Sequence, residues 1–115
     1  MVSAMPSYRD KKRYVIFRIH SEEPLDFSEI KNSIMNSVFD WLGEEQAAKS
    51  GMKIIRNLWD EKAQTGFIRC SPKYVDKIKV SLALIHQIGD SRVVFQTLRV
   101  SGTIKSGSSA KPDTV

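Results

Sequence analysis

The sequence is poor in cysteine and in long apolar runs. Cys70 is the only cysteine among 115 residues, which excludes an intramolecular disulfide and a zinc site built from several thiolates. We expect it to be a buried structural thiol, since it falls on the apolar side of a short strand-like run. No apolar run approaches the ~20 residues of a membrane span, and residues 1–10 contain no apolar stretch typical of a secretory signal. We therefore expect a soluble, cytoplasmic protein with no membrane partner.

Histidine is scarce as well, and the acidic residues form no catalytic pattern. His20 and His86 are the only histidines, and their positions have no paired spacing. No metal-ligand spacing, nucleophile elbow or phosphate-binding glycine loop is present. We predict no catalytic residue, no metal ligand and no cofactor bound by this chain. The adjacent acids fall in connections or at element ends, as solvating charges usually do: Glu22-Glu23, Glu44-Glu45 and Asp60-Glu61.

Positive charge, in contrast, is in excess. Eighteen Lys and Arg residues against thirteen acids give a net charge of +5, which favours a polyanionic partner: nucleic acid first, an anionic membrane surface second. The densest cluster is Arg9, Lys11, Lys12 and Arg13, for which we predict phosphate contacts. Lysines also decorate the exposed side of the last expected helix, where phosphate binding and a merely solvated helix face are equally compatible with the pattern. These are Lys73, Lys77 and, further round, Lys79.

The composition predicts one folded domain between two irregular ends. Residues 1–10 have no periodicity and form an expected flexible arm. Residues 106–115 are small, polar and rich in helix breakers, which is typical of a disordered tail. The folded domain is expected over residues 11–105.

Apolar periodicity predicts alternating strands and helices within this domain. Asp26, with Glu29 three residues later, forms a capping-box pattern, and we expect a helix from there to Gly43 followed by a short second helix over 44–50. Ser71-Pro72 begins another helix, expected to stop at Gly89-Asp90. The first helix has the apolar stripe Phe27, Ile30, Ile34, Val38 and Trp41; the last has Val75, Ile78, Leu82 and Ile85. Strands are expected over 13–20, 52–59, 66–70 and 92–100.

This order, β-α-(α)-β-β-α-β, predicts a ferredoxin-like, RNA-recognition-motif-like α+β sandwich with an antiparallel sheet and the helices on one face. In that topology the first and third strands lie inside the sheet. The facing of the last strand is not determined by its pattern, because both of its faces are apolar. The predicted open face combines apolar side chains and arginines that need a partner to cover them: Tyr14, Ile16, Arg18, Phe67 and Arg69.

Two kinds of partner fit this face. Gly66-Phe67 is similar to the start of the strand-three motif of RNA-recognition motifs, whose aromatic side chains stack on bases. Arg69, however, occupies the position where a second stacking aromatic is expected. The base-stacking platform is therefore incomplete, and a contact with a protein is the favoured reading of this face.

Four segments in order resemble the archaeal ribonuclease P protein component 2 family, relatives of a subunit shared by eukaryotic ribonucleases P and MRP. The resemblance covers about residues 9–105, and its last segment is the most specific. The segments are Lys12-Arg13-Tyr14, Thr65-Gly66-Phe67-Ile68-Arg69-Cys70, the helix from Tyr74-Val75 through Ser81-Leu82-Ala83-Leu84-Ile85, and Thr97-Leu98-Arg99-Val100-Ser101-Gly102-Thr103-Ile104-Lys105.

The resemblance implies a non-catalytic subunit of the ribonucleoprotein that removes the 5′ leader of precursor tRNA. In that family the RNA carries the chemistry and requires magnesium. The protein pairs with protein component 3, often as a two-plus-two assembly, beside other protein subunits. On this reading the sheet face (Tyr14, Ile16, Arg18, Phe67, Arg69) meets a protein partner. The residues expected to neutralise RNA phosphates are Arg9, Lys11, Lys12, Arg13, Lys73, Lys77 and Lys105.

Two alternatives remain open at the level of sequence. One is a stand-alone regulatory domain of ferredoxin-like fold that binds a small molecule in a sheet-to-sheet dimer. The other is a stand-alone binder of single-stranded RNA, which requires base stacking on Phe67.

Overall fold

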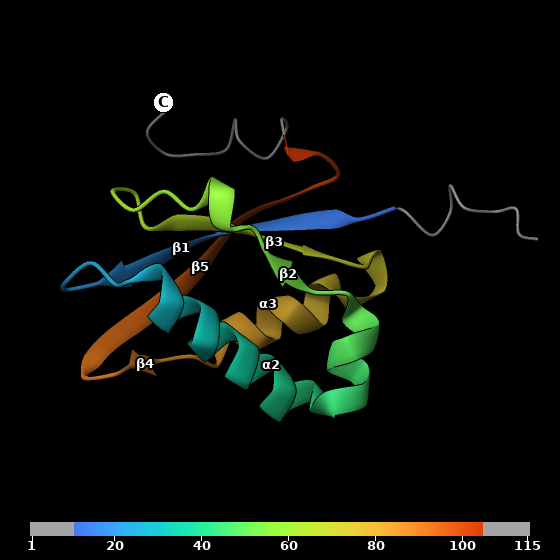
Figure 1. Cartoon of the computed structure of the whole chain (residues 1–115), viewed down its shortest axis with the longest axis horizontal. Coiled ribbons are helices and arrows are strands. Elements are labelled where there is room, and N and C mark those ends of the chain that lie inside the picture. Colours follow the sequence, from blue (N-terminus) through green and yellow to red (C-terminus); the bar gives the residue numbers. More distant parts are fainter. Residues whose placement is uncertain (1–10, 105–115) are drawn as a thin grey trace, which may run out of the picture.

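The computed structural model describes residues 11–104 (Figure 1). The arm and tail predictions, and with them Arg9 and Lys105, lie outside these residues. The described elements, in chain order, are β1 (Arg13–Ser21), α2 (Phe27–Ser50), β2 (Lys53–Ile54), the 3-10 helix η1 (Arg56–Leu58), β3 (Thr65–Cys70), the 3-10 helix η2 (Pro72–Tyr74), α3 (Val75–Ala83), β4 (Gln87–Ile88) and β5 (Ser91–Ser101).

The sheet has the order β2-β3-β1-β5-β4, and its paired strands are antiparallel. β1 lies in the middle, between β3 and β5, and β3 is its inner neighbour. Helices α2 and α3 lie together on one side of the sheet, below it in Figure 1. The predicted ferredoxin-like arrangement, with the first and third strands inside the sheet, is confirmed. β4 is an additional edge strand.

The core lies between the helices and one face of the sheet. Alternation along β1 turns Val15, Phe17 and Ile19 toward the helices, so that the strand contributes three buried side chains to a single layer. The helix side of the cluster is formed by the residues with helical spacing, as predicted: Phe27, Ile30, Ile34 and Val38 of α2, and Ile78 and Leu82 of α3. The facing of β5 is also resolved, because Val93 and Phe95 are buried in this cluster.

Helix α2 begins and bends where the sequence predicted. Asp26 is the N-cap, and its N–H donates to Glu29 Oε1 at 3.4 Å within a capping box. Gly43 has φ 85° and ψ 164°, which is not helical and divides α2 into a long and a short segment. The prediction that Trp41 belongs to the apolar stripe is wrong, since its side chain is 49% exposed. The residue that packs against the core at this point is its neighbour Leu42, just before the bend. No helix in the described range 11–104 is both long and apolar enough to cross a membrane.

Two predicted elements end earlier than their patterns suggested. The strand over 52–59 is reduced to β2, because the chain turns into η1 and Trp59 then packs against Phe17 and Phe27, with ring centroids 6.4 and 6.0 Å apart. The helix expected to reach Gly89 ends at Ala83. The chain beyond it forms β4, which turns back into β5 through Gly89 at φ 60°.

Candidate RNA interface

Positive side chains gather where β1 begins. Lys11 is exposed, whereas Lys12 and Arg13 are half-buried. Arg13 Nη1 donates a hydrogen bond to the carbonyl of Lys12 at 3.0 Å. The ammonium of Lys12 lies against Gly51, 3.5 Å from the point that a Cβ there would occupy. None of the three cations forms an ion pair with another described residue, so their charges are available to an external anion.

Lys73 lies at the same end of the sheet. Arg13 is the register partner of Cys70, the last residue of β3, and η2 with Lys73 follows two residues later. The Ser71 N–H donates to the Ser50 carbonyl at 2.9 Å, which fixes the start of this segment. We call Lys11, Lys12, Arg13 and Lys73 the basic end of the sheet. The structure thus brings together cations that are sixty residues apart in the sequence.

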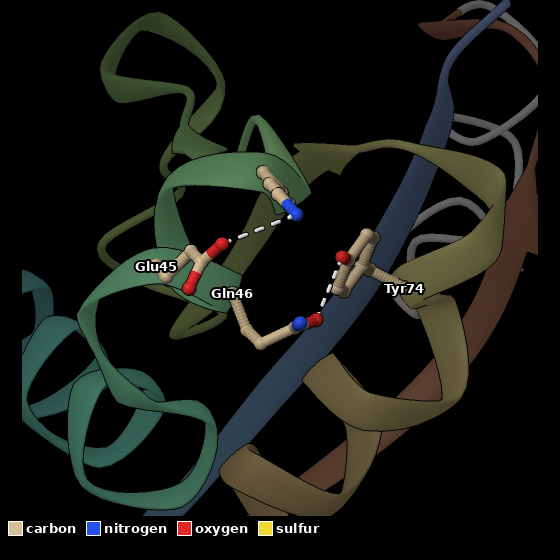
Figure 2. A network of polar contacts seen from close by, with 4 residues as sticks. Glu45, Gln46 and Tyr74 are labelled. Carbon is tan, nitrogen blue, oxygen red and sulfur yellow. Dashed lines mark hydrogen bonds and ion pairs between the residues drawn. The ribbon is translucent and has the colours of Figure 1, made fainter.

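Lys77 is further along, on α3. Its ammonium lies over the ring of Tyr74, 5.4 Å from the centroid. The Tyr74 hydroxyl donates to Gln46 Oε1 at 2.8 Å, and Figure 2 shows this bond reaching from the end of η2 across to α2. The other dashed line in this view marks the ion pair between Glu45 Oε2 and Lys49 Nζ, which are 3.3 Å apart. Lys77 is therefore positioned by an aromatic contact but remains exposed, as Lys79 does.

Cys70 lies beneath the basic end and is buried, as predicted. Burial raises the pKa of its thiol to about 11, and the nearby charge of Lys12 opposes that shift. The thiol is accordingly protonated at neutral pH, which excludes a role as a nucleophile there.

The face of the sheet opposite the helices, here called the helix-free face, carries the predicted partner residues in the predicted order. Tyr14 pairs with Arg69, Ile16 with Phe67 and Arg18 with Thr65. One expectation is wrong: Ile16 and Phe67 are not exposed, since each has a relative exposure of 0%. Tyr14, Arg18 and Arg69 are half-buried.

The two apolar residues lie side by side in the interior of the sheet. They form one register row between the Tyr14–Arg69 row and the Arg18–Thr65 row. A ring without accessible surface cannot stack on a base. The geometry of Phe67 therefore does not provide the platform that the single-stranded RNA alternative requires.

Lys53 is a cation that the sequence reasoning missed. It is the direct register partner of Arg69 on the helix-free face. Two residues further on, Ile55 donates its N–H to the carbonyl of Phe67 at 3.0 Å, which fixes this pairing. The residues between the two strands contain a 3-10 turn, and no sequence pattern would have indicated which residue of β2 opposes Arg69.

Exposed apolar side chains occur on both sides of the sheet: Val94 of β5 is 62% exposed on the helix-free side, and several line a groove on the helix side. Trp41 and Leu84 are 49% and 53% exposed and line a groove of about 530 Å³ between α2 and the connection from α3 to β4. Asp40 and His86 are also in this groove. In the described range 11–104, His, Cys, Asp and Glu side chains form no group of three that could hold a metal ion.

Comparison with known proteins finds a matching family model and relatives that align with most of the chain. Residues 13–110 match the model of the Rpp14/Pop5 family. Proteins named ribonuclease P protein component 2 align with most of the chain. That of Thermococcus kodakarensis is 38% identical over 87% of this chain and 82% of its own length. The Pyrococcus furiosus protein is 41% identical with the same coverage, and the Methanosarcina mazei protein is 35% identical over 91% of this chain and 87% of its own.

A solved structure has the same fold. A chain in the cryo-EM structure of yeast ribonuclease MRP superposes with a TM-score of 0.63, covering 81% of this chain and 75% of that chain. The sequence identity of 13% is low, so this likeness concerns the fold alone.

Proposed function

Because the chain belongs to the Rpp14/Pop5 family, we propose that it is a protein subunit of a ribonuclease P ribonucleoprotein. The observation that carries this proposal is the match to archaeal ribonuclease P protein component 2 over nearly the whole folded domain. The complex removes the 5′ leader of precursor tRNA and works in the cytoplasm. The chemistry is that of the RNA subunit with its magnesium, and this chain contributes no catalytic residue.

The chain's contribution is electrostatic. The basic end of the sheet, with Lys77 beside it, presents cations that have no ionic partner within the described part. When such cations displace counterions from RNA phosphates, they lower the repulsion between packed RNA helices. The complex then needs less magnesium. Arg9 and Lys105, outside the described residues, extend this phosphate-binding set in the sequence.

The protein partner is component 3, in a two-plus-two assembly beside other protein subunits. The burial of Ile16 and Phe67 removes the apolar surface that a protein contact on the helix-free face would use. The groove around Trp41 and Leu84 offers exposed apolar side chains instead. An aromatic residue in a concave apolar surface is typical of the centre of a protein interface, so we place component 3 there.

Reconstitution tests this function. Ribonuclease P RNA, component 3 and precursor tRNA are mixed with and without this chain, and the rate of leader removal is measured over a magnesium series. Omission of the chain is expected to lower the rate at low magnesium, and added magnesium is expected to restore most of it. An unchanged rate at low magnesium would show that the assignment is wrong.

A further inference from the structure

Charge is unequally distributed between the two layers of the domain. The five described strands contain no aspartate and no glutamate, whereas α2 alone carries Glu29, Asp40, Glu44 and Glu45. The acids nearest to the strands along the chain are Glu22, directly after β1, and Asp90, directly before β5. Asp60, which precedes β3, accepts the N–H of Ala63 with its carboxylate at 3.0 Å. The strands carry the cations Arg13, Arg18, Lys53, Arg69, Arg92 and Arg99.

Two of these cations oppose each other directly. Lys53 on β2 and Arg69 on β3 are register partners, and Tyr14 on β1 continues the same row. Directly opposed side chains have Cβ atoms about 4.5–5.5 Å apart, and like charges at that separation destabilise a sheet. Neither cation forms an ion pair or a side-chain hydrogen bond with a described residue. The isolated fold therefore contains a repulsion that an anion between the two side chains would remove.

Arg69 also carries an unused donor. Its Nε–H is buried and has no hydrogen-bond acceptor. Buried donors are rarely left unpaired, because such a group loses its hydrogen bonds to water without replacement. This Nε–H has no accessible surface, so an external phosphate would meet the terminal nitrogens of the half-buried guanidinium, which pair with phosphate through two parallel N–H···O bonds.

We propose that the helix-free face binds the sugar-phosphate backbone of RNA through Lys53, Arg69, Arg18 and the hydroxyl of Tyr14. The proposal rests on the proposed function, which supplies ribonuclease P RNA as the partner. Tyr14 and Arg18 are four residues apart on β1 and hence about 13 Å apart along the strand. A stretch of that length lies alongside several phosphates of one strand, since phosphates recur every few ångströms along a nucleic-acid strand.

The burial of the middle row determines what is recognised. Ile16 and Phe67 are fully buried, so the ring of Phe67 is not available for stacking on a base, and Tyr14 is the half-buried ring that remains in the Lys53–Arg69 row. Contacts limited to phosphates position a protein without reading sequence. The face is also unlike the apolar, charge-depleted centre of a protein interface. A second copy docked face to face would bring together two sheet faces that both carry an excess of cations, which weighs against the sheet-to-sheet dimer alternative.

A salt series on RNA binding tests the proposal. Binding of the full-length chain to ribonuclease P RNA is measured between 50 and 200 mM salt for the wild type, for the Lys53→Gln/Arg69→Gln double variant, and for a Lys31→Gln/Lys49→Gln control. The control removes the same charge from exposed lysines of α2, of which Lys49 is already paired with Glu45. Each lost phosphate contact reduces the slope of log affinity against log salt concentration by about 0.7–0.9. The factor by which RNA affinity falls between 50 and 200 mM salt is therefore expected to be about ten times smaller for the double variant than for the wild type. The control is expected to keep the wild-type slope.

A single variant separates loss of binding from loss of fold. Lys53 is exposed in a two-residue strand, so Lys53→Gln leaves the core intact. Its affinity is expected to fall about threefold less than that of the wild type over the same salt range. Wild-type slopes for both the single and the double variant would overturn the proposal. So would variants that bind RNA normally but lose component 3, because the face would then be a protein interface.

Failure of this inference differs from failure of the proposed function. If only the inference is wrong, the wild-type chain stimulates cleavage at low magnesium and the Lys53→Gln/Arg69→Gln variant stimulates it equally. If the proposed function is wrong, the wild type itself neither stimulates cleavage nor prefers ribonuclease P RNA to an unrelated RNA of equal length.

Discussion

Gly66 is the position where the close packing of the sheet can be tested most directly. A Cβ at this residue would lie 2.7 Å from Cζ of Phe17 and 3.1 Å from Cε3 of Trp59. Phe17 is fully buried and also packs on Phe95, at 5.6 Å between centroids, so its ring has no free space to enter. Overpacking of this kind costs about 1–3 kcal/mol. The loss of unfolded-state entropy on Gly→Ala offsets about 0.4–1 kcal/mol. The net expectation for Gly66→Ala is therefore a destabilisation of about 1–2 kcal/mol.

Thermal and urea unfolding measure this effect, with circular dichroism as the probe. A loss of about 1–2 kcal/mol corresponds to a fall in Tm of roughly 5–15 °C for a domain of this size. Gly102→Ala is the matched control, because the nearest atom to its Cβ is 4.0 Å away, on Arg13. Trimming the ring, as in Phe17→Leu, is expected to cost less in the Gly66→Ala background than in the wild type, since the clash is then relieved. A Gly66→Ala protein as stable as the wild type would show that the Phe17–Trp59 packing is described wrongly.

Three further outcomes follow from single residues. Cys70 is expected to react slowly with iodoacetamide at pH 8 in the native chain and rapidly in urea. Its pKa of about 11 in the folded chain exceeds the ordinary value of 9.0, so the unfolded chain loses the thiol proton first as the pH rises. The free energy of unfolding should therefore fall between about pH 9 and 11 more steeply than in Cys70→Ala. Equal slopes in the two proteins would contradict this. Phe67→Ala should cost about 3–5 kcal/mol in urea unfolding, because the whole ring is buried; loss of oligonucleotide binding with unchanged stability would instead support the single-stranded RNA alternative. Gly43→Ala should lower stability by about 1–3 kcal/mol despite open space around it, since φ 85° is strained for any residue with a Cβ, and a Tm equal to that of the wild type would refute the bend.

The sequence was most informative where local chemistry determines local structure. The capping box at Asp26 and Glu29 and the pair Ser71-Pro72 each marked the start of a helical segment correctly. The apolar alternation of β1 identified its core face. Gly43 was correctly identified as the division of α2, because its conformation is nearly exclusive to glycine. In each case the signal lies within a few residues of the feature that it specifies.

The shortened elements depended on tertiary contacts instead. Residues 52–59 are rich in β-formers, yet the strand stops at Ile54 because η1 returns Trp59 to Phe17 and Phe27. Ile85 continues the helical apolar spacing of α3 and is buried as that spacing suggested. It nevertheless lies beyond the helix, with its N–H donating to the Leu82 carbonyl at 3.1 Å. Apolar periodicity therefore predicted the burial of Ile85 correctly but not the backbone conformation at this residue.

The candidate interface was only partly predictable for a related reason. Alternation placed Tyr14, Arg18 and Arg69 on one face, but it carried no information on whether the row between them is covered. The pairing of Lys53 with Arg69 depends on a register fixed by the Ile55–Phe67 hydrogen bond, across a connection of irregular structure. The basic end needed the return of β3 alongside β1 to bring Lys73 near Arg13.

Two of the proposed binding surfaces, the helix-free face and the groove, lie on opposite sides of the domain. The helix-free face carries Lys53 and Arg69, while the groove with Trp41 is formed by α2 and the connection after α3. They share no residue, and the buried core lies between them. Substitutions at separated sites with no common partner usually have additive effects. We therefore expect the combined Lys53→Gln/Trp41→Ala variant to lose RNA affinity and component 3 affinity by the amounts that each single variant loses. A marked departure from additivity would mean that one partner reaches both surfaces, and the assignment of RNA to the helix-free face and of component 3 to the groove would then be wrong.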